Sequence, residues 1–382
     1  MPLNPLQLRG REAVPSLNLS GKDLGPGSAA VVAAGVSVNG VVTDLNIGGN
    51  EISDEGATAI AEALRGNGVL TSLDVGGNSL TEEAALGIVR VERQRNKLTS
   101  LGLGRCGIGP TGAAEIAEYV SVNEVLTDLN LYNNKIGDEG AKELAAALRV
   151  NGVLTNLSLF GNGIGDEGAK AIGGALRVNG VLTNLDLTDC GIGVEGAKAI
   201  GSALAINGVL TDLNLWDNKI GPEGAKALAS ALRVNGVLKA LDIGTNSIGV
   251  EGAKAIAEAL QGNGVLTSLN VSSNKIGPTG ATAIAEALRV NGVLTTLVLW
   301  GNNIGDKGAK ALASALRVNG VLTNLVLVNN NIGDEGAAAL ASALRVNGEL
   351  KRIDLRLNDL GDEGKGAIRD AVSGRVGFEL EM

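Results

Sequence analysis

Residue types that could carry out chemistry are scarce in this chain. Its 382 residues include no histidine, which excludes a Ser–His–Asp or Cys–His catalytic centre and every metal site with a histidine ligand. Glycine-rich segments such as GIGDEG lack the lysine of a phosphate-binding loop and the context of a dinucleotide site. We therefore expect a protein that is not an enzyme, with no catalytic residues, no cofactor and no metal site.

Aspartates and aromatic rings are the side chains that recur at regular spacing. Either of the pairs Asp186/Asp189 and Asp212/Asp217 could hold a cation, but the simpler expectation is that these carboxylates are solvated. The chain has two tryptophans, two tyrosines and two phenylalanines. Four of these six are separated by multiples of 28 residues: Tyr132, Phe160, Trp216 and Trp300.

Composition narrows the class of protein. A net charge of −9 and a pI of about 4.9 argue against nucleic acid as a partner. The first residues lack the features of a signal peptide, and no apolar run approaches the length of a membrane span. Two cysteines suit a reducing compartment. We expect a cytoplasmic protein with no membrane partner.

The elements that must position these residues follow from an internal repeat. The pattern LxxLxLxxN begins at Val14 and recurs every 28 residues, giving thirteen units over residues 14–377 without insertion or deletion. We number them repeats one to thirteen and number the positions within each from 1 to 28. Cys106 and Cys190 hold position 9, where most repeats have an inward asparagine, so we expect both to be structural.

Each repeat predicts one strand and one helix. A segment such as LTDLNL alternates apolar and polar residues, which is typical of a strand with one buried face. A segment such as PEGAKALASALRV has the spacing of an amphipathic helix. Pro110, Pro222 and Pro278 suit the first turn of a helix, Ser53 and Thr81 could be N-caps, and VNG offers a left-handed stop.

These motifs resemble the leucine-rich repeat family, specifically its ribonuclease-inhibitor-like class and the repeat region of NOD-like receptors. The resemblance covers residues 14–377 and implies an α/β solenoid, a horseshoe with a parallel sheet on the concave face and helices on the convex face. Residues 1–13 are then expected to be an N-terminal cap over the first strand, and residues 378–382 a C-terminal cap strand, because terminal repeats need covering. Repeats three and four are expected to be the least regular.

The alternation of the strand predicts which side chains face the open, concave side. Positions 1, 4, 6 and 9 point into the core, so positions 3, 5 and 7 point outward, with positions 2 and 8 beside them. All four aromatic residues hold position 7. Positions 3, 5 and 8 carry nine aspartates, and only three arginines, Arg105, Arg352 and Arg356, accompany them on this face; the aspartates are Asp44, Asp74, Asp128, Asp186, Asp189, Asp212, Asp217, Asp242 and Asp354. The expected partner-binding residues are Tyr132, Phe160, Trp216, Trp300, Asp128, Asp186, Asp189, Asp212, Asp217 and Asp242.

The function that this pattern favours is a non-enzymatic scaffold that binds, on its concave face, a partner protein with a basic surface. The alternative for the rings is that they only cover neighbouring strands. The alternative for the protein is a Ran-type GTPase-activating protein, since those are similar repeat proteins; they carry a strongly acidic tail, whereas this chain ends in FELEM. We expect a monomer, and a Trp216→Ala variant that loses less than about 0.5 kcal/mol of stability.

Overall fold

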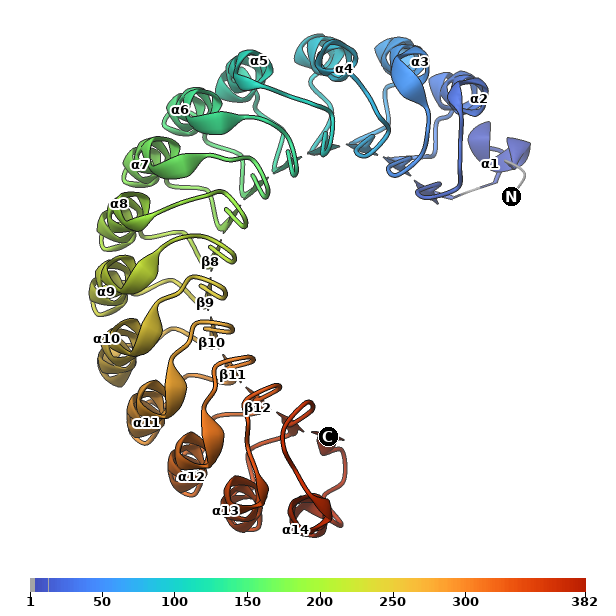
Figure 1. The fold of residues 1–382 in the computed structure, drawn as a ribbon. Coiled ribbons are helices and arrows are strands. Elements are labelled where there is room, and N and C mark those ends of the chain that lie inside the picture. Colours follow the sequence, from blue (N-terminus) through green and yellow to red (C-terminus); the bar gives the residue numbers. More distant parts are fainter. Residues whose placement is uncertain (1–3, 13) are drawn as a thin grey trace. The chain divides into compact units, whose positions relative to one another are not determined.

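The computed structural model describes residues 4–12 and 14–382. It divides into two compact units, Met1–Cys190 and Gly191–Met382, which are described separately. The division lies inside repeat seven, between its strand and its helix, and the 28-residue spacing of the sequence runs through it without a break. Strands and helices alternate along both units, as the sequence predicts (Figure 1).

The first unit contains α1 to α7 and β1 to β7. Its helices are α1 (Pro5–Leu8), α2 (Pro26–Ser37), α3 (Ser53–Gly66), α4 (Glu82–Arg95), α5 (Pro110–Val122), α6 (Gly137–Leu148) and α7 (Gly165–Leu176). Its strands are β1 (Ser16–Asn18), β2 (Asp44–Asn46), β3 (Ser72–Asp74), β4 (Ser100–Gly102), β5 (Asp128–Asn130), β6 (Asn156–Ser158) and β7 (Asn184–Asp186).

The second unit contains α8 to α14 and β8 to β14. Its helices are α8 (Val194–Leu204), α9 (Gly221–Leu232), α10 (Gly249–Gly262), α11 (Gly277–Leu288), α12 (Gly305–Leu316), α13 (Asp334–Leu344) and α14 (Asp362–Val372). Its strands are β8 (Asp212–Asn214), β9 (Ala240–Asp242), β10 (Ser268–Asn270), β11 (Thr296–Val298), β12 (Asn324–Val326), β13 (Arg352–Asp354) and β14 (Glu379–Glu381).

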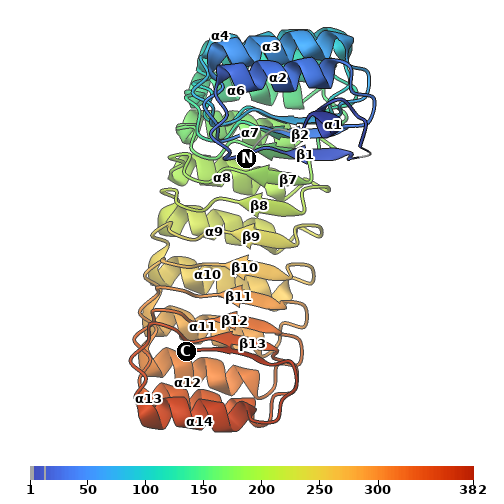
Figure 2. The same ribbon diagram turned by 90° about the vertical axis from the view of Figure 1, so that its right-hand side faces the viewer.

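Within each unit the strands form a parallel sheet in sequence order. Neighbouring repeats pair without slippage, so that Leu157 lies opposite Leu185 in one unit and Leu269 opposite Leu297 in the other. Helices cover one face of each sheet, and no described element covers the other (Figures 1 and 2). We call this uncovered side the concave face. Apart from the half-buried Leu19 of repeat one, the leucines at positions 1, 4 and 6 are buried between sheet and helices, which confirms the predicted leucine-rich repeat solenoid.

Asparagine at position 9 joins each strand to the turn that follows it. Asn134 donates through Nδ2 to the carbonyls of Leu103 and Leu131, each at 2.9 Å. Its Oδ1 accepts from the backbone N–H groups of Cys106 and Ile108, each at 3.0 Å. One buried amide therefore satisfies backbone groups of two consecutive repeats, which would otherwise be buried without partners.

A second asparagine, at position 26, performs the same task where the helix ends. Asn235 Nδ2 donates to the carbonyls of Leu204 and Asn207, at 2.7 and 3.2 Å, and its Oδ1 accepts from the N–H groups of Val237 and Leu238. The glycines of the VNG segments are not left-handed, so the expected left-handed stop is wrong. The asparagine side chain ends the helix by binding the exposed backbone groups.

The helix starts follow the prediction in part. Thr81 is an N-cap whose Oγ1 accepts from the N–H of Ala84 at 3.3 Å, and prolines stand in the first turns of α5, α9 and α11. Ser53 makes no capping bond. It has a φ of 57°, close to the 64° of Gly137 at the same position 12, so this position is a left-handed turn rather than a cap in these repeats.

Repeat three departs from the others through a buried ion pair. Arg95 stands in place of the position 26 asparagine, and Glu92, which is fully buried, replaces a leucine. Arg95 donates to the carbonyl of Asn67 and pairs with Glu92 at 2.5 Å, while Glu92 accepts from the N–H groups of Lys97 and Leu98. The two side chains together replace the donor and the acceptor of the missing amide.

The two ends of the chain also differ from the regular repeats. The described part of the N-terminal segment packs on α2 through Leu8, whose carbonyl accepts from Asn39. At the other end, β14 pairs in parallel with β13. Arg375, again at position 26, donates to the carbonyls of Leu344 and Leu350, and its guanidinium stacks on Phe378 at 4.4 Å.

Breaking the buried pair of repeat three should be costly, whereas replacing it by the regular residues should not. We expect Glu92→Ala to lower the free energy of unfolding by about 3–5 kcal/mol, because it leaves a buried arginine without its acid. The double variant Glu92→Leu/Arg95→Asn restores the leucine and asparagine of the other repeats and should unfold close to the wild type in a urea titration. Equal destabilisation by the single and double variants would contradict this account.

Removal of residues 373–382 should expose the last strand. This deletion takes away β14 and Arg375, so β13 becomes an unpaired sheet edge and carbonyls of the last two repeats lose their donor. We expect a lower melting temperature and concentration-dependent association, measured by calorimetry and analytical ultracentrifugation. If both stay unchanged, the segment does not cap the solenoid.

Candidate functional site

Trp216 and Trp300 stack on each other on the concave face of the second unit. Their ring centroids are 6.2 Å apart and the ring planes differ by 12°. Both side chains are half-buried. They belong to repeats eight and eleven, whose strands are about 14 Å apart at a spacing of 4.8 Å per strand. The two rings therefore reach toward each other across repeats nine and ten.

Small residues between the two tryptophans make this stack possible. Position 7 is Gly244 in repeat nine and Ser272 in repeat ten. A Cβ atom on Gly244 would lie only 2.6 Å from Cε3 of Trp216, and Ser272 is 1 % exposed. Larger side chains at these two positions would occupy the space of the rings.

Three valines beside Trp300 extend the aromatic pair into an apolar surface that was missed in the sequence. Val298 and Val326 hold position 5 of adjacent strands and lie directly opposite each other, and Val328 holds position 7 next to them. All three are half-buried. We call Trp216, Val298, Trp300, Val326 and Val328 the apolar patch. The sequence does set Val298 and Val326 apart, since position 5 is polar or glycine in every other repeat.

The valines also leave backbone donors without the acceptor that other repeats provide. In repeats eight, nine, ten and thirteen, the position 5 side chain accepts from the N–H of position 7; Asn214 and Trp216 are one such pair, at 2.9 Å. Valine cannot accept a hydrogen bond. Within the part of the chain that the structure describes, the N–H groups of Trp300 and Val328 have no acceptor.

Acidic side chains lie beside the patch in repeats eight and nine. Asp212 and Asp217 are exposed, while Asp242 is half-buried and accepts from Gly244 N and Asn270 Nδ2. Asp354 differs from the expectation of an open acidic band, because it is 1 % exposed and paired with Arg352 and Arg356. Burial raises the pKa of Asp354, but the two arginines lower it more and hold it below its usual value. At positions 3, 5 and 8 of this unit, the accessible negative charge is therefore concentrated in repeats eight and nine.

The first unit carries the other expected site residues on its own concave face. Tyr132 and Phe160 are half-buried, and the described residues include no ring contact between them. The Tyr132 ring covers Gly104, where a Cβ atom would be 1.9 Å from Cε1, and the guanidinium of Arg105 lies 5.7 Å from the ring centroid. The Arg105 guanidinium therefore already lies over the Tyr132 ring, where a cation of a partner would otherwise bind.

The aspartates of the first unit are arranged less uniformly. Asp128 accepts from Thr127 Oγ1 and Asn156 Nδ2. Asp186 accepts from the N–H and Oγ1 of Thr188, so its carboxylate orients its own turn. Asp189 is exposed, with a left-handed φ of 49°. The sequence placed all three on the concave face, but their hydrogen bonds could not be inferred from it.

Both cysteines lie in the core, away from the concave face. Burial raises the pKa of Cys106 and of Cys190 to about 12, so neither forms a thiolate at neutral pH. Cys190 Sγ lies 3.2 Å from the carbonyl of Leu159, which is the bond that an asparagine at position 9 would make. The thiol therefore stands in for the amide donor.

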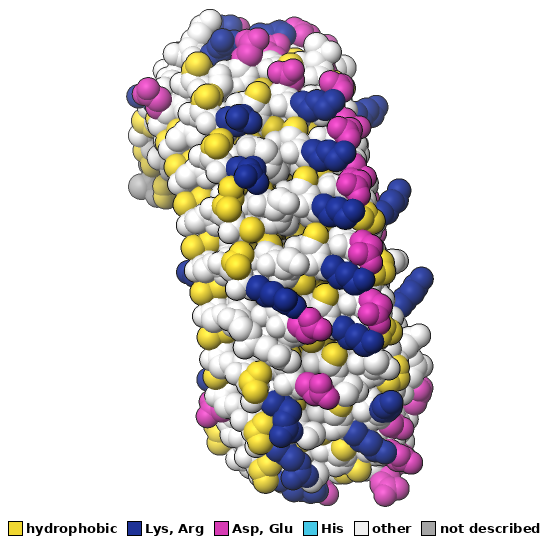
Figure 3. Space-filling model, turned by 90° about the vertical axis from the view of Figure 1, so that its left-hand side faces the viewer, with side chains coloured by type: hydrophobic (Ala, Val, Ile, Leu, Met, Phe, Trp, Pro, Cys, Tyr) yellow, Lys and Arg dark blue, Asp and Glu magenta, His cyan; other side chains and the backbone are white. Residues whose placement is uncertain are grey.

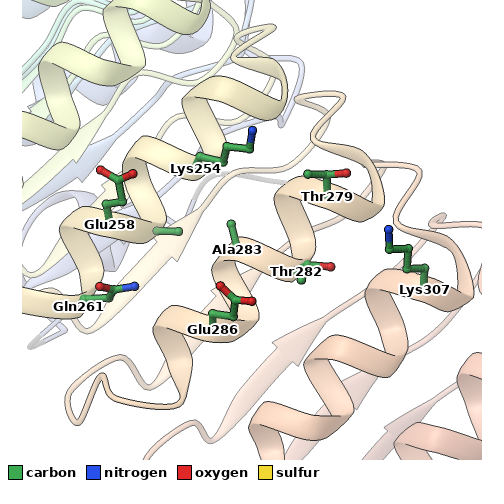
Figure 4. A pocket seen from close by; sticks show the side chains of 9 residues that line it. Lys254, Glu258, Gln261, Thr279, Thr282, Ala283, Glu286 and Lys307 are labelled. Carbon is green, nitrogen blue, oxygen red and sulfur yellow. The ribbon is translucent and has the colours of Figure 1, made fainter.

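The helical face carries rows of charged side chains (Figure 3). Glu and Lys form i,i+3 pairs such as Glu223–Lys226 and Glu251–Lys254, and such exposed pairs contribute little to stability. In α11 this pair is replaced by Thr279 and Thr282. A groove of about 380 Å³ opens there between α10 and α11 (Figure 4). Its lining mixes acids, lysines and threonines without converging groups, so the apolar patch is the stronger candidate.

Comparison with known proteins identifies the repeat. Leucine Rich repeat segments match residues 39–61, 95–117, 122–145, 150–173, 178–201, 207–229, 234–257, 262–285, 290–313, 318–341 and 349–368. These segments together cover more than half of the sequence. The chain belongs to the leucine-rich repeat family. The matches omit residues 62–94, which include most of α4 and the buried Glu92, while Arg95 begins the next matched segment.

Solved structures of other leucine-rich repeat proteins are similar to this one. An internalin (inlF) from Listeria monocytogenes is 20 % identical, with a TM-score of 0.56, over 99 % of this chain and 88 % of that one. Leiomodin-1 actin-binding site 2 is 27 % identical over 34 % of this chain and 77 % of that one, with a TM-score of 0.31. The tropomodulin C-terminal domain from Caenorhabditis elegans is 16 % identical over 38 % and 90 %, with a TM-score of 0.35. A search of curated proteins finds no match.

The residues that the structure describes contain no group of three or more histidine, cysteine, aspartate or glutamate side chains placed to hold a metal ion. None of their helices combines the length and the hydropathy that a membrane span requires.

The ring stack changes the expected effect of Trp216→Ala. Loss of a stacked aromatic partner should cost about 0.5–1.5 kcal/mol, more than the value below about 0.5 kcal/mol expected from the sequence, because the ring has a partner rather than standing alone. A core ring would cost about 3–5 kcal/mol. Denaturant unfolding of the variant distinguishes these ranges, and a loss in the core range would contradict the half-buried placement of the ring.

The two tryptophans should report their acidic surroundings by fluorescence. They are the only tryptophans in the chain, and Asp212, Asp217 and Asp242 concentrate cations near them. We expect caesium to quench their emission more than iodide at low ionic strength, with the difference shrinking as salt screens the aspartates. The Asp212→Asn/Asp217→Asn variant should show a smaller difference, and equal quenching by both ions in the wild type would contradict the assignment.

Proposed function

We propose that this leucine-rich repeat protein is a non-enzymatic scaffold that binds a partner protein on its concave face. The observation that carries the proposal is the half-buried Trp216–Trp300 stack on a sheet face that no described element covers. Aromatic side chains in an open surface supply large contact areas at low entropic cost and often dominate binding energy. The helix in every repeat supports placement in the ribonuclease-inhibitor-like class.

The partner that fits this face is a protein with a basic surface. Asp212 and Asp217 are exposed beside Trp216, and a lysine or arginine there would meet both carboxylates and a ring face. The first unit contributes Asp128, Asp189 and Phe160 on its own concave face, although Arg105 already contacts Tyr132. Such charges raise association rates and select partners more than they raise affinity.

Other parts of the proposal rest on simpler observations. Cys106 and Cys190 are buried and form no disulfide, which suits a protein of the cytoplasm. We take the protein to be a monomer with cap segments at 1–13 and 378–382 around a solenoid at 14–377. A GTPase assay with Ran tests the alternative activity, and stimulation by the wild-type protein would replace the scaffold proposal.

Affinity capture from the source cells tests the proposal. We expect basic proteins retained by the wild type to be lost with the Trp216→Ala/Phe160→Ala variant, and to elute as the salt concentration rises, because exposed charges are screened. Lys142→Ala on the helical face is the matched control and should retain the same proteins. Retention of the same set by all three forms would place the binding surface elsewhere.

A further inference from the structure

We propose that the apolar patch and the aspartates of repeats eight and nine bind one extended segment of the partner. In this segment an aliphatic or aromatic side chain covers the patch, and a lysine or arginine lies about three or four residues away. The inference rests on the proposed function and adds to it the side chains by which the partner is recognised.

The shape of the patch favours a single anchoring side chain. Val298 and Val326 are register partners on adjacent strands, and Trp300 and Val328 follow two residues later, on the same face. Trp216 reaches the group through its stack with Trp300. The five side chains thus form one apolar surface centred on repeats eleven and twelve, where Val298 and Val326 replace the polar side chains that hold position 5 elsewhere in this unit.

The backbone of the patch favours a segment that offers carbonyl groups. The N–H groups of Trp300 and Val328 have no acceptor among the described residues, because valine took the place of the usual Asn or Asp. An extended segment presents unpaired main-chain carbonyls. A main-chain carbonyl of the segment, next to its anchoring side chain, can accept a hydrogen bond from one of these two N–H groups. The patch would then recognise the main chain of the segment as well as its apolar side chain.

Charge complementarity sets the position of the basic residue. Asp242 is two repeats from Trp300, and Asp217 and Asp212 are three repeats away, which corresponds to about 10–14 Å along the stack of strands. An extended segment advances about 3.3 Å per residue. A basic side chain three or four residues from the anchor therefore reaches the aspartates, and the Trp216 ring lies between the two ends.

Selection of peptides on the intact protein tests the inference. The probe is a phage-displayed library of random dodecapeptides, and the enriched peptides are then synthesised and titrated by tryptophan fluorescence. Two variants remove one feature each: Val298→Asn/Val326→Asn and Asp212→Asn/Asp217→Asn. Asparagine occurs naturally at each of these positions in other repeats, as in Asn270, Asn324 and Asn329, so both variants should fold, which circular dichroism and thermal unfolding check. Lys142→Ala on the helical face, away from both features, is the control.

We expect enriched peptides to share an apolar residue and a lysine or arginine three or four positions apart. Each double variant should weaken their binding about tenfold or more, as loss of about 1.4 kcal/mol implies, whereas Lys142→Ala should change it less than about twofold. Peptides that bind the Val298→Asn/Val326→Asn variant as tightly as the wild type, or a library that yields no patch-dependent peptide, would overturn the inference.

The same experiment separates this inference from the proposed function. Basic peptides that lose binding with Asp212→Asn/Asp217→Asn but not with the valine variant leave the acidic concave face as the binding surface and remove only the apolar anchor. Peptides unaffected by either double variant overturn the anchor and argue against the concave face of the second unit as the binding surface.

Discussion

Side-chain amides that bind backbone groups between repeats are the interaction on which the rest of the structure depends. A solenoid has a turn after every strand and after every helix, and each turn buries N–H and C=O groups without regular partners. Asn134 and Asn235 show the two solutions, one beside the strand and one at the end of the helix. Their recurrence every 28 residues sets the register of the strands, and the register places the concave side chains in rows.

Departures from these amides show that the bonding pattern matters more than the residue type. Glu92 and Arg95 divide the acceptor and donor roles of one asparagine between them, Arg375 takes the donor role at the last repeat, and the thiol of Cys190 takes it at position 9. In each case at least one of the carbonyls that an asparagine would bind still finds a side-chain donor. The backbone requirement is constant while the chemistry that meets it varies.

The sequence predicted the features that depend on periodicity and failed at those that depend on side-chain direction. The 28-residue repeat gave the strands, the helices and the concave placement of Trp216 and Trp300. It could not show that the two rings meet, because that depends on how each indole leans over Gly244 and Ser272. It also counted Asp354 as open charge, although two neighbouring arginines bury and pair it. Val298 and Val326 were missed because they carry neither a charge nor a ring, so that only their place at position 5 marks them as part of this surface.

The asparagines that end the helices are almost all followed by glycine, as in Asn151–Gly152 and Asn235–Gly236. In a flexible chain this dipeptide readily cyclises and deamidates, since glycine places no side chain in the way of the attacking backbone nitrogen. In the folded protein these amides are buried and held by several hydrogen bonds. Conversion to aspartate would set a carboxylate against the two carbonyls that the amide nitrogen now binds. Deamidation of the unfolded chain therefore damages the asparagines that join its repeats, whereas folding protects them from this reaction.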